Sequence, residues 1–261
     1  EEIGQTQLEV IRSDFQGTLQ AAEDATLRMA MESEQMIKSG ATRAEMEEFF
    51  YKRKREQKES SNGVCFNAYI YVGEKDWTII PDFAMPPEYH AQERLWYKGA
   101  IENSDKIYVS EPYIDAMSGI MCYTMSKKLP DSNIVVALDF NFSEVQYLIS
   151  KMDELGNRNS LIVTKTGMII GYTDMNLVGQ KVSNKLPEYE EILNRVMKSN
   201  HLDSFTAQMS DGEHTIFSNE TNNGWYMILS VNNWAFYKDS YMQIIFATLL
   251  SLIMMLAIII L

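Results

Sequence analysis

The stretch from residue 89 to residue 139 offers an arginine, a pair of aspartates and several aromatic side chains that together could hold an amino acid. An α-amino acid carries a carboxylate and an ammonium group close together. A planar guanidinium can clamp the first group with two hydrogen bonds, and carboxylate oxygens can accept the donors of the second. Aromatic walls keep water out of such a pocket. The pattern predicts an amino acid pocket made of Tyr89, Arg94, Trp96, Tyr97, Tyr113, Asp115 and Asp139.

Each residue type suits one part of such a ligand. Arg94 is expected to hold the carboxylate, with an edge of Trp96 or Tyr97 against the same group. Asp115 and Asp139 are expected to accept hydrogen bonds from the ammonium group. The two remaining tyrosines would supply walls and hydroxyls, and an aromatic face also attracts a cation.

Simpler explanations exist for each residue taken alone. Arg94 could form a surface ion pair with Glu93 or Glu88, Asp139 could cap the next helix, and Asp115 could belong to a turn. The aromatic residues could lie in the core. Taken together, the seven positions favour a ligand site. Candidates for contact with the ligand's own side chain are Met85, Met117 and Met121.

The pocket residues need elements that position them, and the first of these is a long helix. Apolar residues at steps of three and four predict one helix over residues 5–38. A Ser-Gly pair ends it. Thr42 and Glu45 then form a capping box that opens a second helix.

Beyond residue 60 the apolar pattern becomes that of strands, in two similar halves. In the first half we expect strands at 64–72, 77–80, 107–109, 119–126 and 133–139, and helices at 88–101 and 143–155, with Ser143 as the N-cap of the latter. In the second half we expect a hairpin at 161–172, a helix at 186–198 with Pro187 in its first turn, and strands at 204–209, 213–218 and 225–231. Each half has the order of a five-stranded antiparallel PAS-like sheet.

Charge and hydropathy limit the partners of the chain. The formal net charge of −13 argues against nucleic acid, which needs a basic surface, although an acidic surface can simply serve solubility. Residues 241–261 carry no charge. Since about 20 apolar residues span a bilayer as a helix, we expect a transmembrane helix at 238–261, with a buried core helix as the alternative. Because the chain starts at Glu1 and ends in this run, we expect it to be part of a longer protein.

The cysteines and histidines do not predict a metal site. Cys65 and Cys122 lie in apolar strand-like runs, and two free thiols are favoured over a disulfide. His90, His201 and His214 are far apart in sequence, and we expect each to be a surface residue rather than a ligand. No metal and no cofactor is expected.

The order of elements resembles that of the double Cache (dCache) extracellular sensor domain of prokaryotic signalling receptors. The shared features are a long first helix, two PAS-like modules in series and a terminal membrane helix. The stretch Val135–Phe140, just ahead of a helix, is similar to the last-strand signature of the membrane-distal module. The resemblance implies an extracytoplasmic location, ligand entry at the distal module and a signal passed along the helices.

The seven pocket residues also match the pattern of the amino-acid-binding subgroup of that family. This subgroup uses a tyrosine, an arginine five residues later, a tryptophan-tyrosine pair, a strand tyrosine with an aspartate two residues on, and a closing aspartate. The second half of the chain lacks such a set, with no arginine between Arg158 and Arg195. We therefore expect it to relay a signal without a ligand of its own.

The fold class implied is α+β, with a long N-terminal helix, two tandem PAS-like antiparallel-sheet modules and a C-terminal transmembrane helix. The expected divisions are a helical stalk and second helix at 1–60, a membrane-distal ligand-binding module at 61–156, a membrane-proximal module at 157–237 and the transmembrane helix at 238–261. Residues from 1 to roughly 238 would lie outside the cytoplasm. The apolar seam of the first helix predicts a homodimer through it.

The function implied is ligand sensing for a transmembrane receptor, with a small amino acid as the ligand. The alternative ligands are a biogenic amine, a purine or a small carboxylate, and a module that senses a partner protein is a further alternative. The sequence shows no nucleophile-base-acid arrangement and no glycine-rich phosphate loop, so we do not expect an enzyme. The output could be that of a chemotaxis receptor, a histidine kinase or a cyclic-dinucleotide enzyme.

Overall fold

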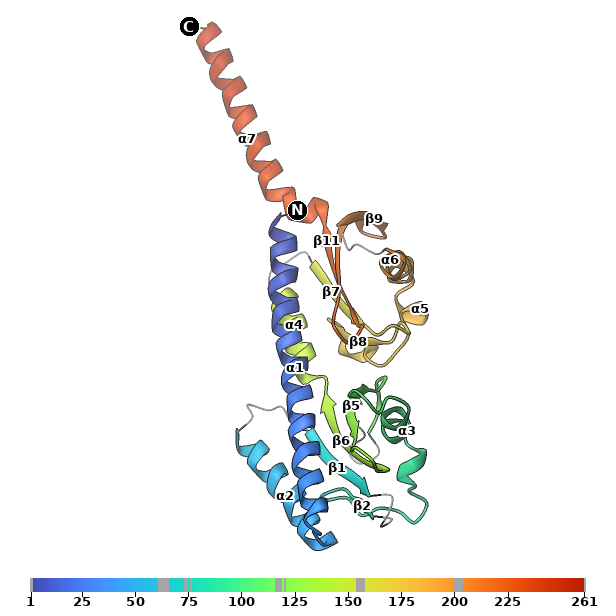
Figure 1. The fold of residues 1–261 in the computed structure, drawn as a ribbon. Helices are drawn as coiled ribbons and strands as arrows, with labels where there is room; N and C mark the ends of the chain where they lie inside the picture. Colours follow the sequence, from blue (N-terminus) through green and yellow to red (C-terminus); the bar gives the residue numbers. More distant parts are fainter. Residues whose placement is uncertain are drawn as a thin grey trace.

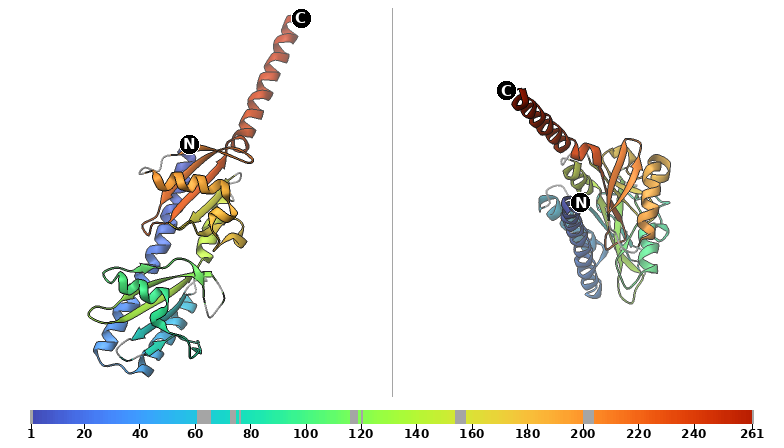
Figure 2. Two further views of the ribbon diagram at one scale, coloured as in Figure 1. Left: turned by 90° about the vertical axis from the view of Figure 1, so that its right-hand side faces the viewer. Right: turned by 90° about the horizontal axis from the view of Figure 1, so that it is seen from above.

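A computed structural model describes residues 2–60, 66–72, 75, 77–115, 119, 121–153, 158–199 and 204–260. One long helix runs beside two antiparallel sheets that follow each other along its length (Figure 1). The α+β class and the long N-terminal helix agree with the sequence-based prediction. Seen from above, the long helix lies on one side of the sheets together with the helices at 43–60 and 143–153, and the helices at 95–102 and 187–198 lie on the other (Figure 2).

The long helix, α1 (Glu2–Lys38), ends where the sequence predicts. Gly40 has a φ of 83°, a left-handed conformation that glycine adopts without a steric penalty. The capping box of α2 (Arg43–Ser60) forms as predicted. The Thr42 backbone N–H donates to Glu45 Oε2 at 2.7 Å, and the Glu45 N–H donates to Thr42 Oγ1 at 3.3 Å. The Thr42 hydroxyl also donates to Glu45 Oε2, and the two bonds from Thr42 to this carboxylate lower the pKa of Glu45.

We call the sheet beside the C-terminal end of α1 the first sheet. Its strand order is β2-β1-β6-β5-β3, and β4 also pairs with β5, so it has six strands rather than five. The extra strand arises because the chain beside β5 breaks at the Ser110–Pro112 stretch, where proline has no N–H to donate. The strands are β1 (Phe66–Val72), β2 (Trp77–Ile79), β3 (Tyr108–Val109), β4 (Tyr113–Ile114), β5 (Met121–Lys128) and β6 (Ile134–Asn141).

The segment predicted as one helix over 88–101 is instead two helical pieces. A 3-10 turn, η2 (Ala91–Glu93), precedes α3 (Leu95–Glu102), and Arg94 between them is extended, with a φ of −77° and a ψ of 148°. The following α4 (Ser143–Asp153) starts at its predicted N-cap residue rather than after it. The Asn141 side chain accepts from the Ser143 N–H at 3.0 Å and takes the capping role.

The second sheet has the five strands that the sequence predicts, in the order β8-β7-β11-β10-β9. Its helical insert includes α6, and Pro187 occupies the first turn of that helix as expected. The strands are β7 (Arg158–Val163), β8 (Ile169–Tyr172), β9 (Phe205–Met209), β10 (Gly212–Glu220) and β11 (Tyr226–Asn232). The insert elements are η3 (Met175–Leu177), α5 (Val182–Lys185) and α6 (Pro187–Lys198).

One apolar core lies under α1 and continues from the first sheet to the second. Trp225, at the start of β11, stacks near Phe15 of α1 with ring centroids 6.0 Å apart. It also meets Tyr123 of β5 edge-on at 5.3 Å, and Tyr123 stacks on Phe140 of β6 at 5.5 Å. These four aromatic residues, which we call the aromatic junction, join α1 and both sheets.

The last helix, α7 (Asn233–Ile260), extends away from the second sheet (Figure 1). Its described side chains, which end at Met254, are largely exposed from Trp234 onward. Within the described residues, no helix has the length and apolar character needed to cross a membrane. The predicted C-terminal transmembrane helix is therefore not seen among those residues.

Candidate ligand-binding site

The centre of the candidate site lies on two paired strands of the first sheet. Thr124 of β5 stands directly opposite Asp139 of β6 in the antiparallel register. Because side chains alternate across a strand, these two residues face away from the aromatic junction. Their neighbours Tyr123 and Phe140, also opposite each other, face into it. These two adjacent cross-strand pairs thus place polar groups on one face of the sheet and packed rings on the other.

Asp139 is only 6% exposed and is held by two hydroxyl groups. Thr124 Oγ1 donates to Asp139 Oδ1 at 2.6 Å, and the Tyr113 hydroxyl donates to the same oxygen at 2.9 Å. The two hydroxyl oxygens are themselves 2.6 Å apart. Hydrogen bonds to an ionised acceptor are short and strong, so this cluster holds the carboxylate in one place. Asp139 therefore does more than cap the next helix, which Asn141 does.

Arg94 lies at the opposite side of the site, at the start of α3. Its guanidinium carbon is 5.4 Å from the centre of the Tyr89 ring, within the range of a cation–π contact. Among the described residues it forms no ion pair with Glu93 or Glu88, which was the simpler explanation of this arginine. The extended backbone at residue 94 separates the arginine from the helix that follows.

Tyr89 connects the cation with the two carboxylates. Burial raises the pKa of Tyr89, while a hydrogen bond with the Trp96 side chain and the charge of Arg94 lower it. The charges of Asp139 and Asp115 raise it again. All four neighbours therefore act on the one phenol, and Asp115 is itself only 8% exposed. Tyr89 and these four neighbours are five of the seven predicted residues, and Tyr113 is joined to them through its bond to Asp139.

A cavity of about 290 Å³ opens beside these residues. Three predicted site residues line it, namely Arg94, Trp96 and Tyr113. The Trp96 backbone is fixed by Ser126 of β5, whose hydroxyl donates to its carbonyl at 2.8 Å. The first turn of α3 is thus tied to the same strand that carries Thr124.

Several predicted residues do not line this cavity. Tyr89, Asp115 and Asp139 are not among its lining residues, although Tyr113, which lines it, donates to Asp139. The Tyr97 hydroxyl donates to the Asn133 carbonyl at 3.3 Å, beyond the other end of β6 from Asp139. At about 3.3 Å per residue, that carbonyl lies roughly 20 Å along the strand from Asp139. Met121 packs under α1 and against Gly179 of the second module, where an added Cβ would collide with its methyl group. Met117 lies outside the described residues, and no contact of Met85 with the cavity is recorded.

Three buried residues of the site escaped the sequence-based prediction: Thr124, Ser110 and Cys122. The signal was the alternation of small polar side chains on β5, at positions 122, 124 and 126. Cys122 is a free thiol, in agreement with the prediction, while Cys65 lies outside the described residues. Burial, with a further effect of the Asp139 carboxylate, raises the pKa of Cys122 to about 12. The thiol is therefore neutral at ordinary pH.

The expectation that His214 is a surface residue is wrong. It is 1% exposed, on the side of the second sheet away from α1. Its Nδ1 lies 2.7 Å from Ser230 Oγ, and its Nε2 lies 2.8 Å from Asp211 Oδ1. Sequence separation hid this cluster, because β10 and β11 bring the histidine and the serine together. His90 is exposed as expected, and His201 lies outside the described residues.

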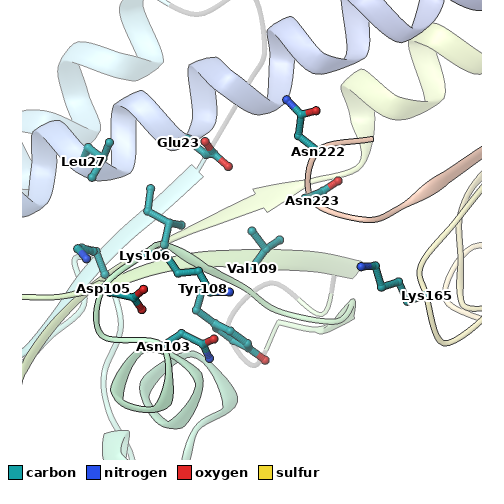
Figure 3. Close-up of a pocket in the computed structure, with 12 residues that line it drawn as sticks. Glu23, Leu27, Asn103, Asp105, Lys106, Tyr108, Val109, Lys165, Asn222 and Asn223 are labelled. Carbon is teal, nitrogen blue, oxygen red and sulfur yellow. The ribbon is translucent and has the colours of Figure 1, made fainter. Parts of the chain in front are cut away.

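A second, larger cavity of about 690 Å³ lies between the modules beside α1. Figure 3 shows Glu23 of α1, Lys106 and Tyr108 of the first module, and Lys165 and Asn223 of the second module around it. Burial, followed by the charge of Asp24, raises the pKa of Glu23. Acidic and basic groups are mixed along its walls, so this polar space has no preference for one ligand charge.

Solved structures with the same architecture come from bacterial chemoreceptors. The ligand-binding domain of the Pseudomonas aeruginosa amino acid chemoreceptor PctC, solved with GABA, aligns with a TM-score of 0.68 at 18% identity. The alignment covers 86% of this chain and 96% of that domain. The corresponding domain of Pseudomonas fluorescens CtaA, solved with L-alanine, gives 0.61 at 20% identity and covers 90% of this chain and 96% of that one. The chain has the dCache fold.

Curated relatives of this dCache chain are methyl-accepting chemotaxis proteins. McpG of Pseudomonas putida is 26% identical over 170 residues, which are 62% of this chain and 26% of that protein. TlpB of Bacillus subtilis is 34% identical over 97 residues, which are 36% of this chain and 14% of that protein. The chain thus matches about a quarter or less of the length of these relatives. No protein-family model matches it.

Proposed function

We propose that this chain is the sensor region of a transmembrane chemoreceptor and that it binds a small amino acid in its first module. The observation that carries this is the arrangement around Tyr89. One guanidinium and two buried carboxylates act on the same phenol. A zwitterion has the complementary pair of charges, and burial strengthens each contact with it. The amino acid ligands of the PctC and CtaA domains are in keeping with this chemistry.

In the proposed complex, Arg94 binds the ligand carboxylate and Asp115 and Asp139 bind the ammonium group. Trp96 and Tyr113 line the cavity on either side. A biogenic amine leaves Arg94 without a partner, and a small carboxylate leaves the two aspartates without one. A buried charge without a partner is costly, so a ligand with both groups fits best. Tyr89 serves as a wall, and Tyr97 supports α3 from the other end of the sheet.

The surrounding divisions belong to the same proposal. Residues 61–156 form the ligand module, 157–237 form the relay module, and 1–60 form the stalk that supports both. Residues 238–261 are assigned to a membrane helix on the sequence alone, because residues 241–261 carry no charge. The two modules then lie outside the cytoplasm. The apolar seam of α1 that predicted a homodimer is buried in the chain's own core, at residues such as Phe15, Leu19 and Met29, so a homodimer through α1 would use its exposed face, where Val10 and Met31 lie.

The aromatic junction provides the relay from ligand to α7. Asp139 and Thr124 face the ligand, and the adjacent Phe140 and Tyr123 face Trp225 of the second module. A ligand that draws Asp139 toward Arg94 moves the same rungs of the sheet that carry these rings. Trp225 lies at the start of β11, and α7 follows directly at the end of that strand. The ligand shifts the equilibrium only by its differential affinity for the two arrangements.

The test is a calorimetric screen of the complete 261-residue chain in lipid nanodiscs against the amino acids, amines, purines and organic acids. We expect binding of at least one amino acid with a dissociation constant in the micromolar range. Decarboxylated and deaminated analogues of that ligand should bind at least about a hundredfold more weakly, since each leaves a buried charge unpaired. Equal affinity for the amino acid and its decarboxylated amine contradicts the proposed role of Arg94.

A further inference from the structure

We propose that Thr124 is a positioning residue for ligand recognition: its buried hydroxyl holds the Asp139 carboxylate in place to accept from the ligand ammonium group. The inference rests on the proposed amino acid function and adds a residue outside the seven that match the family pattern. Thr124 is fully buried, so its hydroxyl has no access to bulk water. Its hydroxyl lies 2.6 Å both from Asp139 Oδ1 and from the Tyr113 hydroxyl.

The number of protons in this cluster fixes the direction of its hydrogen bonds. Three oxygens lie within hydrogen-bond distance of one another: Thr124 Oγ1, the Tyr113 hydroxyl and Asp139 Oδ1. When Asp139 is ionised, two hydroxyl protons serve these oxygens, one from Thr124 and one from Tyr113. Since a carboxylate only accepts, every arrangement of the two protons ends at Asp139. Loss of the Thr124 hydroxyl therefore removes one donor from the charged form of the aspartate.

Thr124 is itself held in place by Ser110, in the short segment between β3 and β4. The Ser110 N–H donates to the Thr124 carbonyl at 2.9 Å, and the Thr124 N–H donates to Ser110 Oγ at 2.9 Å. Ser110 is 1% exposed. This two-way bond continues the sheet across the break that makes β3 and β4 separate strands. The break therefore frees Tyr113 to turn toward Asp139 without releasing β5.

The Thr124 side chain can contribute in two ways. Its methyl group packs in the buried site, and its hydroxyl bonds to Asp139, which lies directly opposite in the register. Valine keeps nearly the same shape and removes only the hydroxyl. Serine keeps the hydroxyl and removes the methyl group. The two variants thus separate the two contributions at one position.

The experiment measures the affinity of the complete chain in nanodiscs for the amino acid found in the screen, from pH 5 to pH 8. Thr124→Val should weaken binding by between about tenfold and about a hundredfold, as expected for a hydrogen bond to a charged group. The loss should grow as the pH falls, because an aspartate with one donor fewer takes up a proton more readily. Thr124→Ser should bind within about threefold of the wild type across the range.

Thr26→Val is the matched control. Thr26 is also fully buried, on α1, where its hydroxyl donates to the Ala22 carbonyl at 2.9 Å, away from the ligand cavity. This variant should keep both the wild-type affinity and its pH dependence. If Thr124→Val does not fold, Thr124→Cys takes its place, because a thiol is a weaker donor of similar size, and its loss of affinity should lie between those of serine and valine.

The outcomes separate this inference from the proposed function. Wild-type binding of an amino acid, with equal affinity and pH dependence for Thr124→Val, overturns the role of Thr124 and leaves the proposed function standing. A serine variant as weak as the valine variant overturns it as well, since that result assigns the effect to packing. If the wild type binds no amino acid, the proposed function fails and the inference fails with it.

Discussion

Each of the two sheets buries one polar cluster on the side that faces its helical insert, and the two clusters differ in what they leave available. In the first sheet the cluster lies on β5 and β6, and in the second it lies on β10 and β11, which hold the same places in the strand order. Asp139 in the first is a buried carboxylate bonded to Tyr113, which lines a cavity. His214 in the second is enclosed by Ser230 and Asp211, which take up both of its ring nitrogens.

The comparison teaches that the same buried position can serve recognition or structure, depending on its partners. A cluster that satisfies itself has nothing to gain from a ligand. In the proposed site, Asp139 is held by two hydroxyls, one of them from the cavity-lining Tyr113, and would gain from a ligand ammonium group. The two inserts show the same contrast. Arg94 lies over Tyr89 next to the cavity, whereas Arg195 of α6 lies 3.9 Å from the centre of the Phe205 ring in the second module.

The largest effect is expected at Asp139. Asp139→Ala should weaken amino acid binding by at least about a thousandfold, because it leaves the buried ammonium group of the ligand with one acceptor fewer. Ser230→Ala, in the corresponding strand of the second sheet, should change affinity by less than about twofold. Calorimetry on both variants checks this. Comparable losses in the two variants would break the distinction between the sheets.

The next effect is expected at the two arginines. Arg94→Ala should weaken binding by about a hundredfold or more, since the ligand carboxylate loses a bidentate partner. Arg94→Lys should recover only part of the loss because an ammonium group cannot match the planar fork. Arg195→Ala serves as the control and should leave affinity unchanged while lowering stability slightly. A ligand that Arg94→Ala binds normally would place the site elsewhere.

A third prediction concerns the link between the two sheets. Trp225→Leu should cost about 2 to 4 kcal/mol of unfolding free energy, because a large buried ring is lost from a shared core. Ligand affinity should change by less than about threefold, as Trp225 lies on the opposite face from the pocket. In the wild type, ligand should slow amide hydrogen exchange in β11, and in the variant this protection should shrink. Undiminished protection of β11 would exclude the aromatic junction as the route.

The smallest effect is expected in the second cluster. Partial burial acts to raise the pKa of Asp211, but bonds from Asn232 and His214 outweigh it and hold the pKa below its ordinary 3.8. A lowered folded pKa means that this stabilisation is complete above the ordinary value and is lost as the pH falls through the folded value. Asp211→Asn should therefore lower the unfolding midpoint by less than about 2 °C at pH 7. Thermal scans should show that the difference disappears below pH 3, with ligand affinity unaffected at pH 7.

The sequence predicts much of this fold because its signals are local. The step pattern of α1, the Thr42–Glu45 capping box and Pro187 in α6 each act within one or two turns, and each appears where expected. The segment around Arg94 was harder, since it switches from a 3-10 turn to an extended residue and then to a helix. That switch depends on contacts with β5, such as the Ser126 hydroxyl on the Trp96 carbonyl.

The site was predictable only where its chemistry is carried by charged and aromatic residues. Arg94, Asp139 and Tyr89 are unusual enough together to attract notice. Thr124 and Ser110 are not, because a threonine in a strand is common, and their importance comes from the register that sets Thr124 opposite Asp139. The same limit explains His214, whose partners lie on separate strands. The pattern predicts Tyr97 in the pocket because it follows Trp96, but α3 turns its side chain toward the other end of β6.

The alternation along β5 and β6 has a consequence for how such a receptor can change over generations. Under the proposed function, substitutions at positions such as 122 and 124, on the Asp139 face, would change which compound is detected. Substitutions at 123 and 140, on the opposite face, would change how strongly detection is coupled to the second module. Ligand preference and signal strength would then depend on neighbouring residues that point to opposite faces of the sheet, so that either could change without the other.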